Sequence, residues 1–240
     1  MTSHADTRRR GSRSKRRVAN GGDAMTSIMN GRERPLADKQ RASSAEILDA
    51  ASRAFARRGY SATSIDDIAD ELGCTKGRIY HYFRSKGDVF MAIHHRAMTW
   101  ALDAVAPAAE RGDLSAAERL RLIVKGHVTH MVEHSSYMSP AEFVNEINLA
   151  REGRSKDASV DEIFGMRRRF EAYFEQVIAD GITSGEFRKC DAKLTAKAIL
   201  GATNWMSVWF QVGSSADTPK RRAAIAEEFS AFAVAGMLAH

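Results

Sequence analysis

The feature that most restricts the fold is a pair of short helical patterns in residues 63–83, separated by little more than Gly73. The first pattern repeats apolar residues at helical intervals: Ile65, Ile68, Ala69 and Leu72. Two pairs can cap it: Thr63 with Asp66, or Ser64 with Asp67. Glycine takes a left-handed turn without steric cost, so Gly73 ends this helix, and the next begins within one or two residues. The spacing predicts a helix-turn-helix.

A longer helical pattern precedes this pair. Ser43 and Glu46 have the spacing of a capping box, and Gly59 is placed to end the helix after Arg58. One apolar stripe runs between them: Ile47, Leu48, Ala51, Ala54 and Phe55. The three patterns together predict a small three-helix unit over residues 43–90.

The last of these helices has two different faces. Ile79 and Phe83 share the stripe that can pack inward, while Gly77 and His81 lie opposite. The helix N-terminus carries partial positive charge and free amide groups that suit phosphate groups. Glycine in a helix costs roughly 1 kcal/mol relative to alanine, which is understandable where another molecule must approach the backbone closely. These features predict a surface for nucleic acid, on which Tyr80 can donate hydrogen bonds to phosphates.

The stretch ILDAASRAFARRGYSATSIDDIADELGCTKGRIYHYFRSKGDVF, residues 47–90, resembles the DNA-binding domain of the tetracycline-repressor (TetR) family of bacterial transcriptional regulators. The resemblance implies that the third helix enters the major groove of a palindromic operator and that Lys86 clamps a phosphate. The DNA-binding residues expected from it are Ser64, Thr75, Lys76, Gly77, Arg78, Tyr80, His81, Tyr82 and Lys86. Cys74 departs from the family's usual valine or serine. Two alternatives stay open: Tyr82 buried between helices, and Arg78 simply solvated.

The rest of the chain continues the helical spacing, so we predict an all-α protein. Breaks at glycine, serine and proline residues divide it into six further helices, expected at 85–109, 115–135, 140–152, 159–184, 191–212 and 218–238. With the first three these make nine, as in a TetR-like architecture. The expected organisation is a basic disordered extension (1–42), the DNA-binding domain (43–90), and an effector-binding and dimerisation domain (91–240).

The last two helices are more apolar than a single internal face requires. A dimer interface in a four-helix arrangement explains the surplus, and a palindrome read in successive major grooves also calls for a dimer. The expected interface residues are Trp205, Trp209, Phe229 and Phe232. A buried core helix in a monomer is the alternative.

A ligand cavity is expected between the fourth and eighth helices. Its predicted lining is Met98, His127, Met131, Phe143, Phe170, Tyr173 and Phe174, with Met91, His95, Trp100, His134, Ile147 and Asn148 as further candidates. Such residues also fill ordinary cores, so the set is a hypothesis. The stretch AILGATNWMSVWF is similar to those of acyl-CoA-responsive members of the family, which implies a small hydrophobic effector, with an acyl-CoA of fatty-acid or sterol breakdown as the candidate.

The three histidines His127, His130 and His134 share one helical face, but three residues of one helix cannot comfortably surround a tetrahedral ion. We therefore expect no metal and no cofactor. Motifs of hydrolases, metalloproteases and nucleotide-binding enzymes are absent from the sequence, so we expect no enzyme and no catalytic residues. Cys74 and Cys190 suggest reduced thiols rather than a disulfide framework.

Charge is concentrated in residues 1–41, which contain eleven basic and four acidic residues, whereas the other 25 basic and 26 acidic residues nearly cancel. Such an arm attracts polyanions, although a solvated tail remains the plainer interpretation. No stretch has the length and apolarity of a membrane span, and we expect a cytoplasmic protein. The main hypothesis is a ligand-responsive, dimeric DNA-binding repressor. The alternative is a sequence-independent nucleoid protein that depends on the basic arm.

Overall fold

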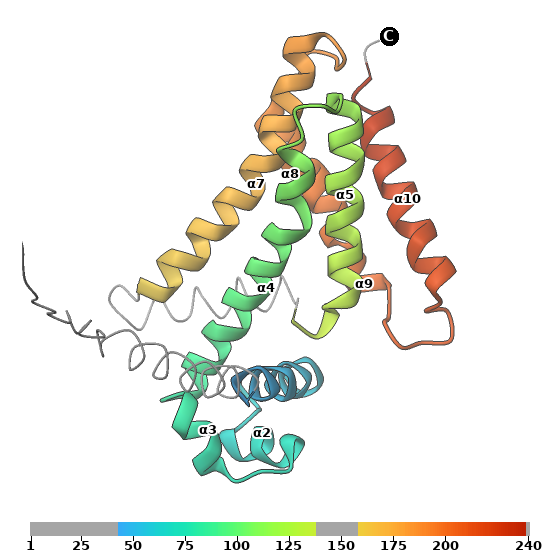
Figure 1. The fold of residues 1–240 in the computed structure, drawn as a ribbon. Coiled ribbons are helices and arrows are strands. Elements are labelled where there is room, and N and C mark those ends of the chain that lie inside the picture. Colours follow the sequence, from blue (N-terminus) through green and yellow to red (C-terminus); the bar gives the residue numbers. More distant parts are fainter. Residues whose placement is uncertain (1–42, 138–157, 239–240) are drawn as a thin grey trace, which may run out of the picture. The chain divides into compact units, whose positions relative to one another are not determined.

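A computed structural model describes residues 43–137 and 158–238, in which all regular elements are helical apart from one isolated bridge between Phe187 and Leu238. The all-α prediction is confirmed. The first helix covers residues 43–58. It is followed by α2 (Ile65–Leu72), α3 (Lys76–Tyr82), α4 (Lys86–Ala109), α5 (Ala116–Glu133), the 3-10 helix η1 (Ser135–Tyr137), α7 (Ala158–Ser184), α8 (Ala192–Asn204), α9 (Met206–Trp209) and α10 (Pro219–Ala235) (Figure 1).

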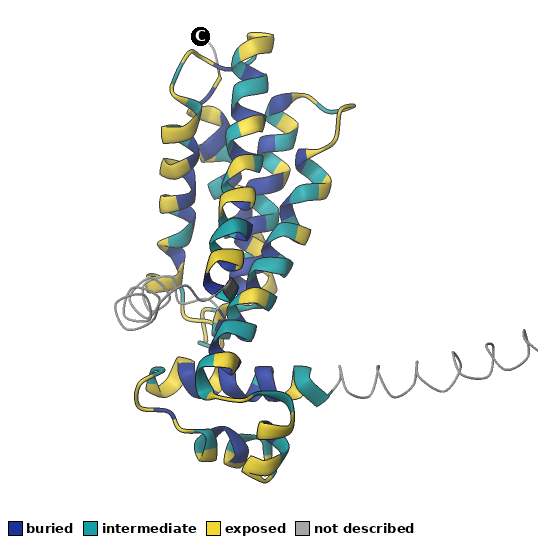
Figure 2. Cartoon of the chain, turned by 90° about the vertical axis from the view of Figure 1, so that its left-hand side faces the viewer, coloured by how far each residue is buried: buried dark blue, intermediate teal, exposed yellow. Residues whose placement is uncertain are grey.

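The helices pack around two apolar cores that share α4. Residues near the beginning of α4, such as Val89 and Ile93, pack with the first three helices. Those in its second half, such as Val105, pack with α5, α7, α8 and α10. Helix α4 contacts α5 and α7, while α5 contacts α10 and α7 contacts α8. Buried residues follow the inward sides of these helices (Figure 2). One rigid helix therefore belongs to both the helix-turn-helix unit and the larger helical body.

The clearest close approach is between α4 and α5. A Cβ atom on Gly126 would lie 2.4 Å from the carbonyl oxygen of Ala104, closer than real Cβ atoms come. Only glycine allows the two backbones to lie at this separation. The contact fixes how α5, which carries His127, is seated against α4.

Two details differ from the sequence-based expectations. Ser43 is itself helical, so it is not the N-cap, and the carboxylate of Glu46 binds Arg78 instead of closing a capping box. The helix expected at 191–212 is divided into α8 and α9. The Thr203 hydroxyl just before the break donates to the carbonyls of Ile199 and Leu200, a pattern that bends helices. The helix expected at 140–152, with Phe143, Ile147 and Asn148, lies outside the described residues, as does the extension 1–42. Within the described ranges, no helix is both long and apolar enough to cross a membrane.

Candidate nucleic-acid interface and internal cavity

The turn between α2 and α3 is set by local chemistry. The Ser64 hydroxyl accepts the backbone N–H of Asp67 at 3.1 Å, and the Asp67 carboxylate accepts the Ser64 N–H at 2.8 Å, which completes a capping box. The Ser64 hydroxyl also donates to the Asp67 carboxylate at 2.6 Å, and this bond, followed by the one from the Ser64 N–H, holds the pKa of Asp67 below its ordinary value. Of the two predicted caps, the Ser64 pair is therefore the one that forms. Thr63 is buried instead, and its hydroxyl donates to the carbonyl of Gly59 at 2.8 Å.

Gly73 closes α2 in the predicted left-handed conformation, with φ of 65°. The N–H of the next residue, Cys74, returns to the carbonyl of Ala69 at 2.9 Å, as in a Schellman motif. Thr75 is the N-cap residue of α3, which starts at Lys76. The turn is thus as short as the spacing predicts, and it determines where α3 points.

Helix α3 presents most of the predicted contact residues to solvent. Ile79 is fully buried, whereas Tyr80 is 51% exposed. The exposed predicted residues of α3 and its cap are Thr75, Lys76, Gly77, Tyr80 and His81. A Cβ on Gly77 would meet only the Thr75 hydroxyl at 3.8 Å, so packing inside the chain does not require a glycine there. The free backbone at Gly77 suits close approach by a DNA strand.

Two predicted contact residues on α3 are also bound within the chain. The Arg78 guanidinium donates to Glu46 of the first helix at 2.6 Å. Tyr82 is partly buried against the core of the three-helix unit. Phe83, expected to continue the helical stripe, is the C-cap of α3 in an extended conformation and packs on the same core. Arg78 is therefore anchored rather than simply solvated.

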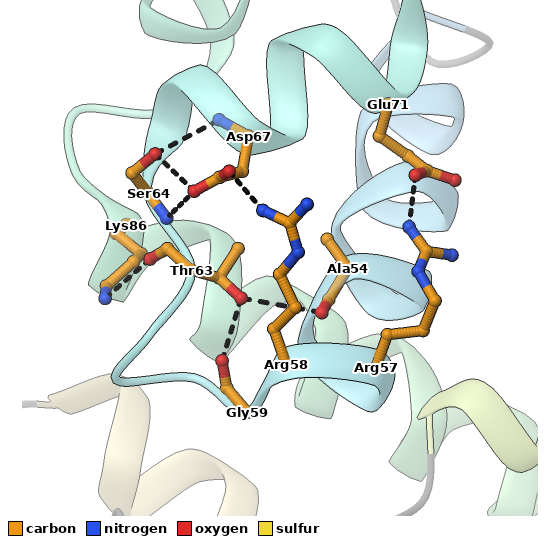
Figure 3. Close-up of polar contacts among 9 residues, drawn as sticks. All are labelled: Ala54, Arg57, Arg58, Gly59, Thr63, Ser64, Asp67, Glu71 and Lys86. Atoms are coloured by element: carbon orange, nitrogen blue, oxygen red, sulfur yellow. Dashed lines mark hydrogen bonds and ion pairs between the residues drawn. The ribbon is translucent and has the colours of Figure 1, made fainter.

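Lys86 binds the loop before α2. Its ammonium donates to the carbonyl of Thr63 at 2.9 Å (Figure 3). It also donates to the carbonyl of Tyr60 at 2.8 Å and lies 4.3 Å from the centre of the Tyr60 ring. These contacts engage the ammonium within the chain and hold the loop, whereas the expected phosphate contact of Lys86 stays a prediction. Ser64 caps α2 and is exposed to solvent, and its expected DNA contact also stays a prediction.

Ion pairs connect the first helix to α2. Arg57 binds Glu71, and Arg58 binds Asp67 (Figure 3). Hydrogen bonds from Arg57 and then Arg53 hold the pKa of Glu71 below its ordinary value. Because the arginines are exposed and the carboxylates only partly buried, each pair contributes little to stability by itself, and the pairs serve to position α2 against the first helix.

A cavity of about 280 Å³ lies among α4, α5, η1, α7 and α8. Its lining is mostly apolar with a few polar side chains, as in small-molecule sites. The residues are His94, Ala97, Met98, Ala101, His127, Tyr137, Arg167, Phe170, Glu171, Lys197, Leu200, Gly201 and Asn204. Lys197 and Gly201 are exposed to solvent, so the cavity opens between α7 and α8.

The structure places three predicted pocket residues, Met98, His127 and Phe170, on this cavity. Phe143 lies outside the described residues, and the other predicted residues lie elsewhere in the structure. Met131 and Phe174 are buried in the core, and the Tyr173 hydroxyl donates to Glu110 at 2.7 Å. Trp100 stacks on His134 at 4.1 Å and does not line the cavity.

The sequence interpretation missed the contribution of α8. Lys197, Gly201 and Asn204 recur at helical intervals and line one side of the cavity. This spacing was available in the sequence, but the only residues we named individually on this helix were those of the expected dimer interface, and the helix otherwise served as a hint about the effector.

His127 is the most deeply buried polar group of the cavity, with 2% of its surface exposed. Its Nε2 atom lies 3.0 Å from Oδ1 of Asn204, while Nδ1 has no hydrogen-bond partner among the described residues. Burial lowers the pKa of His127 to about 4, against the opposing effect of the Asn204 bond. Burial also lowers the pKa of His94 to about 3. A cavity lined by neutral histidines favours an uncharged group of the ligand. Among the described residues, no three His, Cys, Asp or Glu side chains converge in a way that could hold a metal ion.

Charged residues stand at the open side. Lys197 binds Glu171 at 3.0 Å, and Arg167 lies 3.6 Å from the same carboxylate. Two cations share one anion, which leaves a net positive charge beside the opening.

Large apolar side chains remain exposed on the last helices. Trp205 is 64% exposed and Phe232 is 72% exposed, and the Trp209 ring stacks with Phe229 at 6.5 Å. Further exposed members of this apolar face are Leu194, Val208, Val212 and Leu238. Exposed groups of this kind mark surfaces that another molecule covers.

Two family profiles match this chain, one over the helix-turn-helix unit and one over the larger helical body. A profile described as "Tetracyclin repressor-like, C-terminal domain" matches residues 113–237, and one described as "Bacterial regulatory proteins, tetR family" matches residues 47–93. The Fatty acid metabolism regulator protein of Bacillus subtilis (strain 168) is 23% identical over 168 residues, which cover 67% of this chain and 82% of that protein.

Two solved structures share the fold. PfmR, a TetR family transcriptional regulator from Thermus thermophilus, gives a TM-score of 0.68 at 27% identity, over 79% of this chain and 97% of that chain. AibR in complex with isovaleryl coenzyme A and operator DNA gives a TM-score of 0.64 at 22% identity, over 79% of this chain and 97% of that chain. The second likeness shows the fold alone.

Proposed function

This chain belongs to the TetR family of DNA-binding transcriptional regulators, and we propose that it is a dimeric repressor that a small hydrophobic effector releases from its operator. The observation that carries the proposal is that α4 lines the cavity and also packs in the core of the helix-turn-helix unit. A ligand that binds one conformation of this helix better than another shifts the positions available to the DNA-binding unit.

The proposed effector is an acyl-CoA. The cavity of about 280 Å³ is near the lower end of the size range of ligand pockets, so it suits a short or medium acyl group rather than a whole coenzyme A molecule. Its neutral histidines suit an uncharged acyl group, and the net positive charge of Arg167 and Lys197 at the opening suits the coenzyme A phosphates. The isovaleryl coenzyme A bound by AibR and the name of the Bacillus regulator are consistent with this class.

The proposed DNA contacts are the exposed residues of α3 and its cap, with Tyr82 and Arg78 beside them. Lys86 contributes mainly by holding the loop before α2. The proposed dimer forms through the apolar face of α8, α9 and α10, around Trp205 and Phe232. Burial of these side chains against a second copy provides the hydrophobic stabilisation that exposed rings lack. The domain divisions at 42 and 90 are part of the same proposal.

The test of DNA recognition is selection of operator fragments from the chain's own upstream intergenic DNA, followed by affinity measurements with full-length protein and with a variant lacking residues 1–42. We expect both proteins to prefer the same fragment, with a smaller salt dependence for the shortened one because fewer cations contact phosphate. Equal binding to all fragments by the full chain, lost on truncation, would establish the nucleoid alternative instead.

A further inference from the structure

Tyr137 contacts both the internal cavity and the first helix of the DNA-binding unit. Its ring lines the cavity, and the residue is only 6% exposed. Its hydroxyl donates to the Asp49 carboxylate of the first helix, and burial followed by this bond raises the pKa of Tyr137. Of the residues lining the cavity, Tyr137 is therefore one that also binds the DNA-binding unit directly.

The first helix is held at the same point by α4. One nitrogen of the Arg96 guanidinium lies 3.2 Å from the Tyr137 hydroxyl, 3.2 Å from the carbonyl oxygen of Ala45 and 3.3 Å from the Asp49 carboxylate. The guanidinium also lies 4.4 Å from the centre of the Trp100 ring. Arg96 and Tyr137 thus form one polar cluster with the first helix, and movement of the tyrosine alters bonds on both Asp49 and Arg96.

The opposite end of this connection is α3. Glu46 lies one turn before Asp49, and residues three apart are neighbours on a helix surface. Glu46 accepts the 2.6 Å bond from Arg78 of α3. The first helix therefore carries both ends of the connection: Asp49 binds Tyr137 of the cavity wall, and Glu46, one turn away, binds Arg78 of α3.

We propose that Tyr137 is the coupling residue through which the cavity and the DNA-binding unit affect each other. A ligand that displaces its ring withdraws the hydroxyl from Asp49, which releases the first helix and, through Glu46, the position of α3. The inference rests on the proposed function for the direction of regulation. It does not depend on the identity of the effector, because coupling between two sites is reciprocal and operator DNA must alter the cavity wall as well.

The test measures amide hydrogen exchange of the full chain with and without a saturating operator duplex that the wild-type chain binds. The peptides that report on the cavity wall cover residues 94–101 and 127–137. In the wild type we expect DNA to slow exchange there by about fivefold or more, the lower end of ordinary allosteric coupling. In Tyr137→Phe, which keeps the ring and removes the hydroxyl, we expect most of this change to disappear while exchange in α3 still responds to DNA.

Tyr173→Phe is the matched control, because it also removes a tyrosine hydroxyl bound to a carboxylate but lies outside the cavity lining. It should behave as the wild type. Asp49→Asn tests the same bond from the other side and should reproduce Tyr137→Phe. The coupling role is overturned if operator DNA leaves hydrogen exchange of the wild-type cavity wall unchanged. It is also overturned if Tyr137→Phe and Asp49→Asn both show the full wild-type response. Isovaleryl coenzyme A is added in a separate arm, and its failure to release DNA counts against the proposed effector alone.

Discussion

Glu46 and Asp49 lie one turn apart on the first helix, and each binds a different functional part of the chain. Glu46 accepts a hydrogen bond from Arg78 of α3, and Asp49 accepts one from Tyr137 at the cavity wall. The first helix is thus more than a support for α2 and α3. In the proposed coupling, it transmits a change at the cavity to α3, which carries the proposed DNA contacts.

Gly77→Ala should separate DNA binding from folding. The added methyl group meets only the Thr75 hydroxyl at 3.8 Å, and alanine is a better helix former by roughly 1 kcal/mol. We expect unchanged or slightly higher stability in urea unfolding and an operator affinity at least about tenfold lower, the loss that about 1.4 kcal/mol of binding free energy represents. A variant that binds DNA normally would show that the strand does not approach the backbone at this position.

Lys86→Met should destabilise the fold. It removes the ammonium that donates to the carbonyls of Tyr60 and Thr63, and we expect a loss of about 1–3 kcal/mol in the free energy of unfolding. Lys76→Met is the comparison, because that side chain is 64% exposed and has only a 3.5 Å ion pair with Asp66. It should change stability by less than about 1 kcal/mol and reduce the salt slope of operator binding by about one. The reverse pattern would restore the expected phosphate-clamping role to Lys86.

The α4–α5 contact gives a prediction about stability alone. Gly126→Ala places a methyl group against the Ala104 carbonyl, and we expect a loss of about 1–3 kcal/mol despite alanine's better helix propensity. Gly165→Ala in α7, whose added group would meet only an Arg168 nitrogen at 3.8 Å, should instead gain up to about 1 kcal/mol. Thermal or urea unfolding measures the change in stability of each variant. Equal changes in the two variants would mean that α4 and α5 can move apart to accommodate the methyl group.

The dimer proposal predicts that charge on the apolar face of α8, α9 and α10 separates the subunits. Trp205→Glu and Phe232→Glu would each bury a carboxylate without a partner, which is strongly unfavourable. Sedimentation should show the wild type at twice the chain mass of 26.5 kDa and the variants near that mass. Leu122→Glu, on α5, is the control and should remain dimeric. A monomeric wild type, or variants that stay dimeric, would place the interface elsewhere.

The buried histidines predict a loss of stability in acid. Burial lowers the folded-state pKa of His127 from 6.5 to about 4, so the unfolded chain binds this proton more readily. The contribution of His127 is fully present above about pH 6.5 and decreases as the pH falls toward 4. We expect on the order of 1–2 kcal/mol to be lost by about pH 5. Urea unfolding at neutral and acid pH measures it, and His127→Gln should reduce the pH dependence whereas exposed His81→Gln should not.

Much of the fold could be predicted because its determinants are local. The Ser64–Asp67 cap, the left-handed Gly73 and the buried Ile79 follow from neighbours within a few residues, and the structure confirms each. The first helix is the exception, since Ser43 has the composition of a cap but is itself helical.

The candidate site was harder to predict because its contacts join distant segments. Tyr137 and Asp49 are 88 residues apart, and no periodic pattern connects them. Helix α8 was misjudged for a different reason: apolar spacing showed that two faces are used, but not that Lys197 and Asn204 turn toward a cavity while other residues form the exposed face. Periodicity identifies a helix more readily than it identifies the neighbour of each face.

The most direct test of the central claim is the operator dissociation constant of the full-length chain at moderate salt, with and without a panel of acyl-CoA thioesters that begins with isovaleryl coenzyme A. We predict specific binding that at least one thioester weakens by about 5- to 150-fold, the range of ordinary allosteric coupling. Coenzyme A without an acyl group should have little effect, since the cavity is proposed to hold the acyl part. Specific binding that no thioester alters would contradict the proposed effector class and leave only the DNA-binding function.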